Sequence, residues 1–400
     1  MSIEVLQAAA AILGVAFTLA IACSTAAYFV GNVIARNVEE TKRIGLKNEN
    51  TGLSVQLAQA ERQIGDLNDA LKKSTGDGKL AAEDSMFAGR VETVAQFLSV
   101  FGNSVWLAKE TAERSEPKQS NLKIITFANN KGGVGKTTLS ANYARYLHKA
   151  GRRVLMVDLD YQGSMTATAL AATSTESREG ASADIPANAY SWLDEPSDPD
   201  DFIRSLTRLG DGDRFFLVES SYNLPSEEDR NLFLWLVGRS KTDVRFRLHE
   251  LLYSKAVLGR FDVVIIDSPP KLSVGSVNAL TASTHYVVPT ILDTLSTTPI
   301  RFLLSSYKGL FKNLGVSPEL VGVAAVKTRY NVLRPDEVVL VEELDQLVKQ
   351  SAPSAQVFAS TLPFSVDYAE AAGRSFVVDD TKAGKKMRVL FAEISRSIGL

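Results

Sequence analysis

The stretch from Ala128 to Thr138, which reads ANNKGGVGKTT, most strongly constrains what this chain can fold into. It follows an apolar run at 124–127 that is typical of a buried strand, and it precedes a helical pattern of apolar residues. A strand, a glycine-rich turn and a helix N-terminus together aim backbone N–H groups and a positive dipole end at one point. The stretch therefore predicts a phosphate-binding loop.

The residue types in this loop suit a nucleotide phosphate. Gly132, Gly133 and Gly135 let the backbone approach phosphate oxygens closely. Lys136 supplies a cation, and Thr137 supplies a hydroxyl group for Mg²⁺. A glycine–lysine turn without a ligand is the alternative, but it does not account for the strand and helix patterns on either side.

The loop departs from the common G-x-x-x-x-G-K-[ST] motif at its start. Asn130 stands where that motif has its first glycine, and Lys131 adds a second lysine. With this lysine the loop resembles the deviant Walker A loop of the ParA/MinD family of dimerising P-loop ATPases. The resemblance implies that ATP and Mg²⁺ are the cofactors.

Two apolar runs that end in aspartate fall where such an ATPase needs them. Val154–Asp160 is similar to the family's second motif, with Tyr161 in place of the usual proline. Phe261–Pro270 is similar to its Walker B segment. A carboxylate at the C-terminal end of a parallel strand, beside the phosphate loop, can hold Mg²⁺ directly or through water. One such aspartate alone is often a solvated strand end, but the order of the segments favours the site.

The resemblance assigns a role to each matching residue. Lys136 is expected to neutralise the β- and γ-phosphates, and Thr137 to ligate Mg²⁺. Asp267 is expected to reach that ion from outside its inner coordination sphere. Asp160 matches the position that orients the attacking water, and Asp158 is expected to support the phosphate loop.

Lys131 matches the family's signature lysine, which reaches into the partner subunit and contacts its nucleotide. This implies an ATP-dependent homodimer that sandwiches the nucleotides and switches with the γ-phosphate. The expected catalytic residues are Lys131, Lys136 and Asp160, and the residues expected at the metal site are Thr137 and Asp267. The remaining predicted nucleotide contacts are Gly132, Gly133, Val134, Gly135, Thr138 and Asp158, together with Arg329 and Pro363, which border the adenine.

The resemblance covers residues 121–400, which is an ordinary size for one domain. Strands are expected at 122–128, 153–158, 214–218, 262–267, 285–290, 320–326 and 356–362. Their alternation with helical patterns predicts an α/β fold, a doubly wound and mostly parallel sheet with the nucleotide at the C-terminal strand ends. The polar segment from Thr173 to Asp201 is predicted to be a long loop, and the tail at 385–394 to pack on the sheet.

The N-terminal end of the chain is strongly apolar. No charged residue occurs between Val5 and Ala35, a run longer than the ~20 residues that cross a bilayer as a helix. Basic residues follow this run and only Glu4 precedes it, so the positive-inside rule leaves the rest of the chain in the cytoplasm. Residues 1–35 are therefore predicted to be a transmembrane helix of a single-pass bacterial inner-membrane protein, contacting the lipid bilayer through residues 5–35. A cleaved signal peptide and a buried soluble helix are the alternatives.

Two helical segments are expected between this run and the ATPase domain. Apolar residues from Leu46 to Leu71 recur in steps of four and three, which predicts a coiled coil over 36–74. A lone amphipathic helix is the alternative reading of that pattern. Residues 75–120 are predicted to be a linker and an amphipathic helix, whose apolar stripe is more typical of core packing than of a partner groove.

Composition narrows the function further. The only cysteine, Cys23, excludes a disulfide framework and a thiolate metal site. The net charge of −2 gives no basic signature of nucleic-acid binding over the whole chain.

Three function classes fit these features. The first is a membrane-tethered ATPase switch that positions or regulates an unidentified protein partner, and it is the one predicted. The second is a DNA-partitioning ATPase that binds nonspecific DNA, but Phe364 and Asp367 stand where such relatives carry arginines. The third is a membrane-linked tyrosine autokinase, which usually ends in a tyrosine cluster, whereas no tyrosine follows Tyr368.

Overall fold

The computed structural model describes residues 106, 121–173, 198–210, 212–240, 242–292, 297–328, 333–379 and 381–400. The chain divides into two compact units, residues 1–85 and 86–400, and every described residue belongs to the second. The coiled coil predicted over 36–74 lies outside the described residues, as does the 75–120 segment apart from Trp106.

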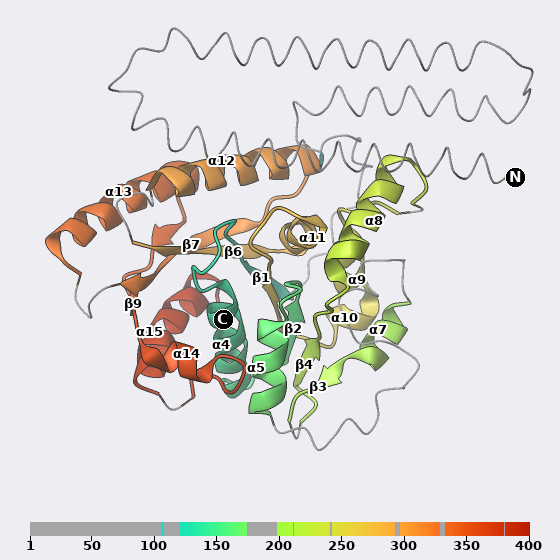
Figure 1. Ribbon diagram of the computed structural model, residues 1–400, viewed down its shortest axis with the longest axis horizontal. Coiled ribbons are helices and arrows are strands. Elements are labelled where there is room, and N and C mark those ends of the chain that lie inside the picture. Colours follow the sequence, from blue (N-terminus) through green and yellow to red (C-terminus); the bar gives the residue numbers. More distant parts are fainter. Residues whose placement is uncertain are drawn as a thin grey trace, which may run out of the picture. The chain divides into compact units, whose positions relative to one another are not determined.

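A mostly parallel sheet forms the centre of the second unit (Figure 1). Its strand order is β3-β4-β2-β5-β1-β6-β7-β8, with β9 also paired to β7, and the β3–β4 pair is antiparallel. The strands are β1 Lys123–Phe127, β2 Val154–Asp158, β3 Thr207–Arg208, β4 Phe215–Val218, β5 Val263–Asp267, β6 His285–Ile291, β7 Glu319–Thr328, β8 Gln356–Val357 and β9 Leu362–Pro363.

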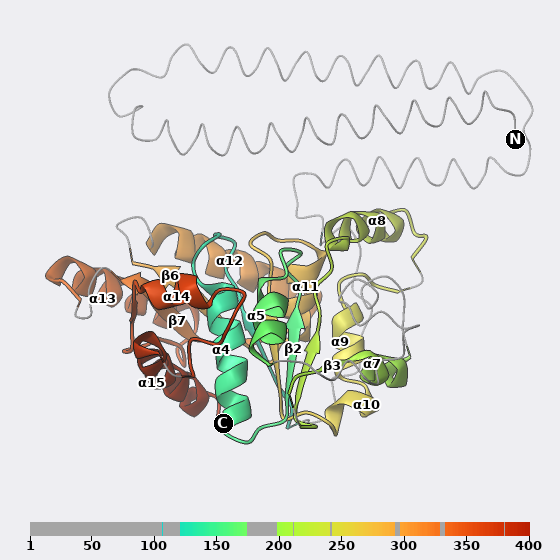
Figure 2. The same cartoon turned by 60° about the horizontal axis from the view of Figure 1, so that its bottom comes forward.

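Helices cover both faces of this sheet (Figures 1 and 2). On one face lie α4 Lys136–Lys149, α5 Ser164–Ala172, α14 Val366–Ala371 and α15 Lys382–Ser397. On the other lie α7 Pro199–Ser205, α8 Leu224–Leu236, α9 Arg247–Leu252, α10 Lys255–Leu258, α11 Val274–Ala282, α12 Thr297–Leu314 and α13 Pro335–Ser351.

The strands are apolar on both sides because both sides are covered. In β5, Val263 and Ile265 belong to the core beneath α4 and α15, whereas Val264 and Ile266 belong to the core beneath α9 and α11. The side-chain alternation of a strand thus feeds two separate cores. This arrangement confirms the predicted doubly wound fold, including the predicted strand positions, with the last one divided between β8 and β9.

The predicted loop from Thr173 to Asp201 is wrong at its end, where α7 begins. Asp198 caps this helix by accepting a hydrogen bond from the backbone N–H of Asp200 at 2.8 Å, and Pro199 occupies the first helical turn. Both features favour helix initiation. Residues 174–197 lie outside the described residues.

The predicted membrane helix over 5–35 also lies outside the described residues. In the part of the chain that the structure describes, no helix combines the length and apolar character needed to cross a bilayer. This finding contradicts the predicted localisation as a single-pass inner-membrane protein, which is not retained. The prediction depended on the hydropathy and flanking charges of this run alone.

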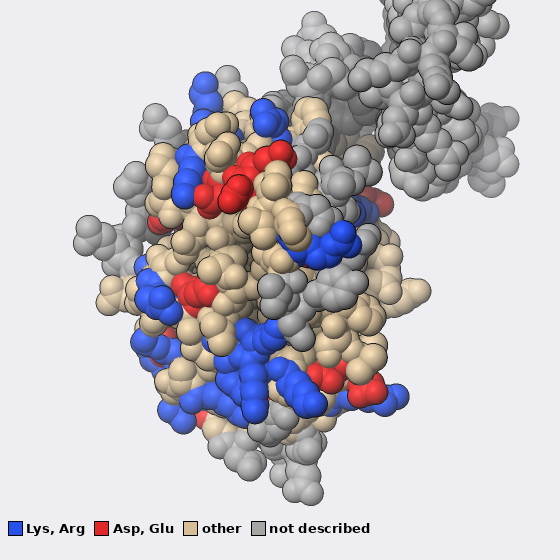
Figure 3. Space-filling model, turned by 90° about the vertical axis from the view of Figure 1, so that its left-hand side faces the viewer, with Lys and Arg blue, Asp and Glu red and all other residues tan. Residues whose placement is uncertain are grey.

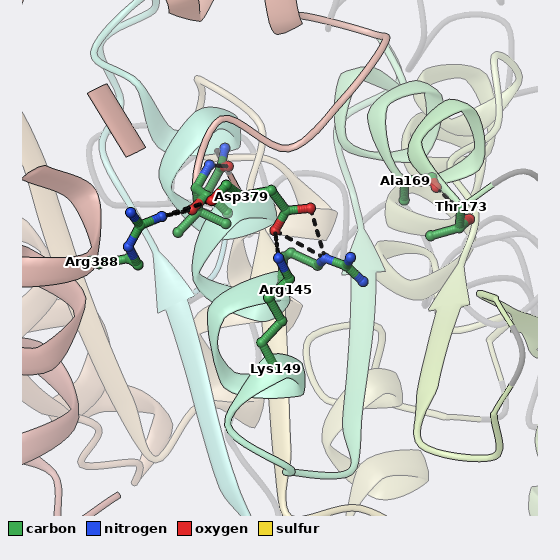
Figure 4. Close-up of polar contacts among 8 residues, drawn as sticks. Arg145, Lys149, Ala169, Thr173, Asp379 and Arg388 are labelled. Carbon is green, nitrogen blue, oxygen red and sulfur yellow. Dashed lines mark hydrogen bonds and ion pairs between the residues drawn. The ribbon is translucent and has the colours of Figure 1, made fainter. Parts of the chain in front are cut away.

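The helix that follows the phosphate loop, α4, is fixed to the C-terminal segment (Figure 4). Arg145 and Lys149 of α4 pair with the carboxylate of Asp379 at 3.2 Å and 2.7 Å. From α15, Arg388 donates to the carbonyl oxygen of Asp379 at 2.9 Å. The tail therefore packs on the sheet beside α4, as the sequence predicts, with Met387 and other apolar residues of α15 buried.

Close packing of α15 gives a stability prediction. A Cβ atom at Gly384 would overlap the backbone carbonyl oxygen of Val377. We expect Gly384→Ala to lower the free energy of unfolding by about 1–3 kcal/mol, because backbone must shift to relieve the overlap. Urea unfolding of the variant and the wild type measures this difference.

Gly309 in α12 is the matched control. A Cβ atom there would have no heavy atom within 4 Å. Gly309→Ala is expected to raise the free energy of unfolding by about 0.4–1 kcal/mol, because alanine restricts the unfolded chain. Equal effects at the two glycines would contradict the packing described for α15.

Candidate nucleotide-binding site

The loop between β1 and α4 has the backbone of a phosphate cradle. Gly133 and Gly135 have φ angles of 73° and 84°, in the left-handed region that favours glycine. Gly135 is also the N-cap of α4, and no side chain caps that helix end. The first N–H groups of α4 are thus left for a ligand, and an anion is the ligand that the helix dipole favours.

Two asparagines hold the start of the loop. The Asn129 side chain donates to the Pro289 carbonyl oxygen at 2.7 Å and accepts from the Lys131 backbone N–H at 2.9 Å. Asn130, which replaces the usual glycine, accepts a hydrogen bond from the Tyr307 hydroxyl at 3.3 Å. These contacts tie the loop to β6 and α12, a support that the motif alone does not indicate.

Lys136 is the first residue of α4 and only 6% of it is exposed. Its ammonium donates to the carbonyl oxygen of Lys131 at 3.1 Å, so it lies folded into the loop. Burial lowers the pKa of Lys136, and the carboxylates of Asp267 and Asp160 act in the opposite direction. The predicted phosphate-binding cation therefore lies among the predicted acids.

Asp267 ends β5, which lies between β1 and β2 in the sheet. It is fully buried, and neither of its carboxylate oxygens has a hydrogen-bond partner among the described residues. Burial raises the pKa of Asp267 well above its ordinary value, with the charge of Asp158 adding to this. The neighbouring Thr137 hydroxyl and the Lys136 ammonium lower the pKa instead.

The Thr137 hydroxyl and the Asp267 carboxylate together fit a site for Mg²⁺. A hydroxyl and a buried carboxylate without other partners are oxygen donors of the kind that Mg²⁺ prefers. Among the described residues, no group of three or more His, Cys, Asp or Glu side chains is placed to hold a metal by itself. Phosphate oxygens and water would therefore complete the coordination of an ion at Thr137, and this assignment stays a prediction.

Asp158 ends β2 and lies beside Asp267 in the strand register. One carboxylate oxygen accepts from the Asp160 backbone N–H at 3.2 Å, and the other accepts from the N–H and hydroxyl of Thr166, both at 2.8 Å. These bonds support the Asp160 loop and the first turn of α5. The sequence predicts instead that Asp158 supports the phosphate loop, and none of these three bonds reaches that loop. Burial raises the pKa of Asp158 to about 6, although the hydrogen bonds oppose the shift.

The predicted adenine border is described only in part. Arg329 lies outside the described residues. Pro363 ends β9 beside β7, and Val326 of β7 would lie 3.7 Å from a Cβ atom at Gly135. The β7–β9 corner therefore adjoins the phosphate loop, and the contact between Pro363 and adenine stays a prediction.

Sequence reasoning missed Glu228, a buried acid of α8. Its carboxylate accepts from the Ser273 hydroxyl at 2.9 Å and from the Gly275 backbone N–H at 2.5 Å. It thus satisfies the N-terminus of α11, the helix that follows Asp267 in the chain. The sequence signal for this contact was the spacing of Glu228 on the same helical face as Leu224 and Trp235.

The fold and the site together define a P-loop ATPase, and the comparisons agree. A family model described as an AAA domain matches residues 122–318. The sporulation initiation inhibitor protein Soj of Bacillus subtilis is 29% identical over 265 residues, which are 65% of this chain and 92% of that protein. The chromosome-partitioning ATPase Soj of Thermus thermophilus is 29% identical over 256 residues, 63% of this chain and 86% of that protein.

Solved structures share the fold. The ATP complex of a McdA variant from Cyanothece has a TM-score of 0.56 at 20% identity, over 70% of this chain and 98% of that chain. The chain is thus a P-loop ATPase that is similar in sequence to two Soj proteins and in fold to McdA.

The buried acids give a pH prediction. The folded state holds the Asp158 proton with a pKa of about 6, whereas the unfolded chain releases it near pH 4. Between these values the folded state binds more protons, so the free energy of unfolding falls as pH rises. This contribution to the free energy of unfolding is fully present below about pH 4 and is lost as pH rises through about 6. It is on the order of 3 kcal/mol, because about two pKa units correspond to that energy.

Urea unfolding of the nucleotide-free, Mg²⁺-free protein across pH 4 to 7 tests this. Asp158→Asn removes the titrating group, so we expect its unfolding free energy to vary less with pH in that window. Parallel pH curves for the wild type and the variant would contradict the raised pKa of Asp158.

Proposed function

We propose that this ATPase is a switch in which two copies sandwich ATP and, in that state, position or regulate a protein partner or assembly. The observation that carries the proposal is the single site formed by the phosphate loop, Lys136 and the aspartates that end β2 and β5. Lys131, the additional lysine at the start of the phosphate loop, has an exposed side chain.

Each residue then has a defined task. The N–H groups at the start of α4 and the Lys136 ammonium bind the β- and γ-phosphates. Mg²⁺ held at Thr137, with Asp267 behind it, would neutralise charge that develops on the phosphates. Asp160 orients the attacking water, and Asp158 holds the backbone that carries Asp160.

The dimer gives Lys131 its role. An exposed lysine on one copy would contact the nucleotide of the other copy, so that each hydrolytic site contains residues from both. In the proposed dimer, residues 121–400 form the ATPase domain and residues 36–74 form a coiled coil. Residues 75–120 connect the two. A coiled coil would hold two ATPase domains near one another and raise their effective concentration.

DNA partitioning is the second candidate. The Thermus thermophilus relative is named a chromosome-partitioning ATPase. Lysine and arginine side chains also gather on part of the face shown in Figure 3, below a group of acidic side chains. Contacts of this kind to DNA phosphates would be sequence-independent.

A protein partner is favoured by the surface that follows β9. Phe364 is 69% exposed and Val366 of α14 is also exposed, so this corner presents apolar groups. The acidic side chain nearby, Asp367, is occupied in accepting a hydrogen bond from the Ala383 backbone N–H at 3.0 Å. Exposed aromatic residues are typical of protein interfaces rather than of phosphate contacts.

Titration with random-sequence duplex DNA tests whether the ATP-bound state binds DNA or acts on a protein partner. The full-length protein would be studied with ATP and with ADP at several salt concentrations, with Lys136→Ala as the nucleotide-free control. We expect ATP-dependent dimerisation without ATP-dependent DNA binding. Binding that requires ATP and weakens steeply with salt would contradict the protein-partner proposal and favour partitioning.

A further inference from the structure

The loop that carries Asp160 is held by a closed ring of hydrogen bonds. Asp158 accepts from the Asp160 backbone N–H and from Thr166. The Thr166 hydroxyl in turn accepts from the Ser220 backbone N–H at 3.0 Å. The Ser220 hydroxyl completes the ring by donating to the Asp160 carbonyl oxygen at 2.5 Å.

The ring joins β2 and α5, which are consecutive in the chain, to the end of β4, which lies 54 residues beyond Thr166. Asp158 ends β2, Thr166 lies in the first turn of α5, and Ser220 follows β4. Because β4 pairs with β2 in parallel, with Val157 opposite Val218, both chains leave the sheet at the same edge. Gly163 has a φ of 61°, which favours glycine, and a Cβ atom there would lie at an ordinary contact distance of 3.8 Å from Ser220 Cβ, so the turn lies directly beside Ser220.

The Asp160 side chain depends on this backbone. Its carboxylate accepts from the Gln162 backbone N–H at 3.1 Å, a bond within the same turn. The Asp160 carbonyl oxygen also accepts from the Gly163 N–H at 2.9 Å, which closes that turn. The turn is thus internally rigid, and Ser220 and Asp158 set where it lies relative to the sheet.

We propose that Thr166 and Ser220 are positioning residues that fix the Asp160 carboxylate for hydrolysis. The proposal rests on the proposed function, in which Asp160 orients the attacking water. Neither residue needs to touch the nucleotide, because each acts on the backbone of the Asp160 turn. A misplacement of about 1 Å of a catalytic group costs up to about 100-fold in rate.

Steady-state hydrolysis and ATP binding by the full-length protein test this directly. Ser220→Ala and Thr166→Val are each expected to lower kcat by about tenfold while the Kd for ATP changes less than about twofold. Thr166→Ser keeps the hydroxyl and is expected to restore kcat. Ser226→Ala is the matched control, since its hydroxyl donates to the Asn223 carbonyl oxygen at 2.8 Å and not to the Asp160 turn.

A double variant separates positioning from a general structural effect. When Asp160→Ala has removed the carboxylate, adding Ser220→Ala is expected to leave the residual rate unchanged. A further loss of rate in that background would overturn the inference. So would wild-type kcat in both Ser220→Ala and Thr166→Val, or a loss of ATP affinity in these variants as large as their loss of kcat.

The same data separate this inference from the proposed function. If Asp160→Ala hydrolyses ATP as fast as the wild type, the proposed role of Asp160 fails and the positioning role fails with it. If Asp160→Ala is inactive but Ser220→Ala is fully active, only the positioning role fails.

Discussion

Lys136→Ala is expected to abolish ATP binding at the concentrations used for hydrolysis. Lys136 opens α4, is almost fully buried and points its ammonium into the phosphate loop. Truncating one partner of a buried, charged hydrogen bond costs about 2–5 kcal/mol. This corresponds to an increase in the Kd for ATP by roughly a factor of 30 to several thousand.

Calorimetric titration of the full-length protein with ATP and Mg²⁺ measures this loss. Lys149→Ala is the matched control, because Lys149 ends the same helix and pairs with Asp379 at 2.7 Å. We expect that control to bind ATP as the wild type does. Retained ATP affinity in Lys136→Ala would refute the assigned phosphate site.

Asp160→Ala is expected to leave ATP binding intact and to lower the hydrolysis rate by about 100-fold or more. Losses of this size are typical when a side chain that orients the attacking water or accepts its proton is removed. Because the γ-phosphate then persists, the variant is expected to accumulate as an ATP-bound dimer. Light scattering with ATP and with ADP gives the mass in each state.

Asp213→Ala serves as the control for that variant. Asp213 precedes β4 at the opposite edge of the sheet and pairs with Arg260 at 3.3 Å. We expect it to hydrolyse ATP at the wild-type rate. If Asp160→Ala stays monomeric with ATP, the sandwich proposal fails.

Much of the fold was predictable because the central strands are short, almost wholly apolar runs. The β5 run ending at Asp267 is buried on both faces, and burial on both faces leaves no polar alternation to confuse the pattern. The phosphate loop was predictable because Gly133 and Gly135 hold φ angles that other residues rarely adopt. In both cases the signal is local in sequence.

The parts that sequence reasoning missed depend on contacts between distant residues. Ser220 meets Asp160 only because β4 and β2 pair, and neither residue carries a motif for that contact. Glu228 likewise caps α11 across many intervening residues. The strand β3 has only two residues, too few to show a period. The wrong prediction of localisation rested on the hydropathy and flanking charges of residues 5–35 alone.

Complementation between two inactive variants tests the central claim most directly, because the proposed dimer places Lys131 of one copy in the site of the other. Lys131→Ala and Asp160→Ala are each expected to hydrolyse ATP poorly when assayed alone. In a mixed dimer, the Lys131→Ala copy keeps its own Asp160 and receives Lys131 from its partner, so one of the two sites is complete.

The measurement is the ATPase rate of an equimolar mixture of the two full-length variants. Random pairing in a symmetric dimer predicts a rate of about a quarter of the wild-type value. A mixture that is no faster than the average of its two components would contradict a site shared between two copies.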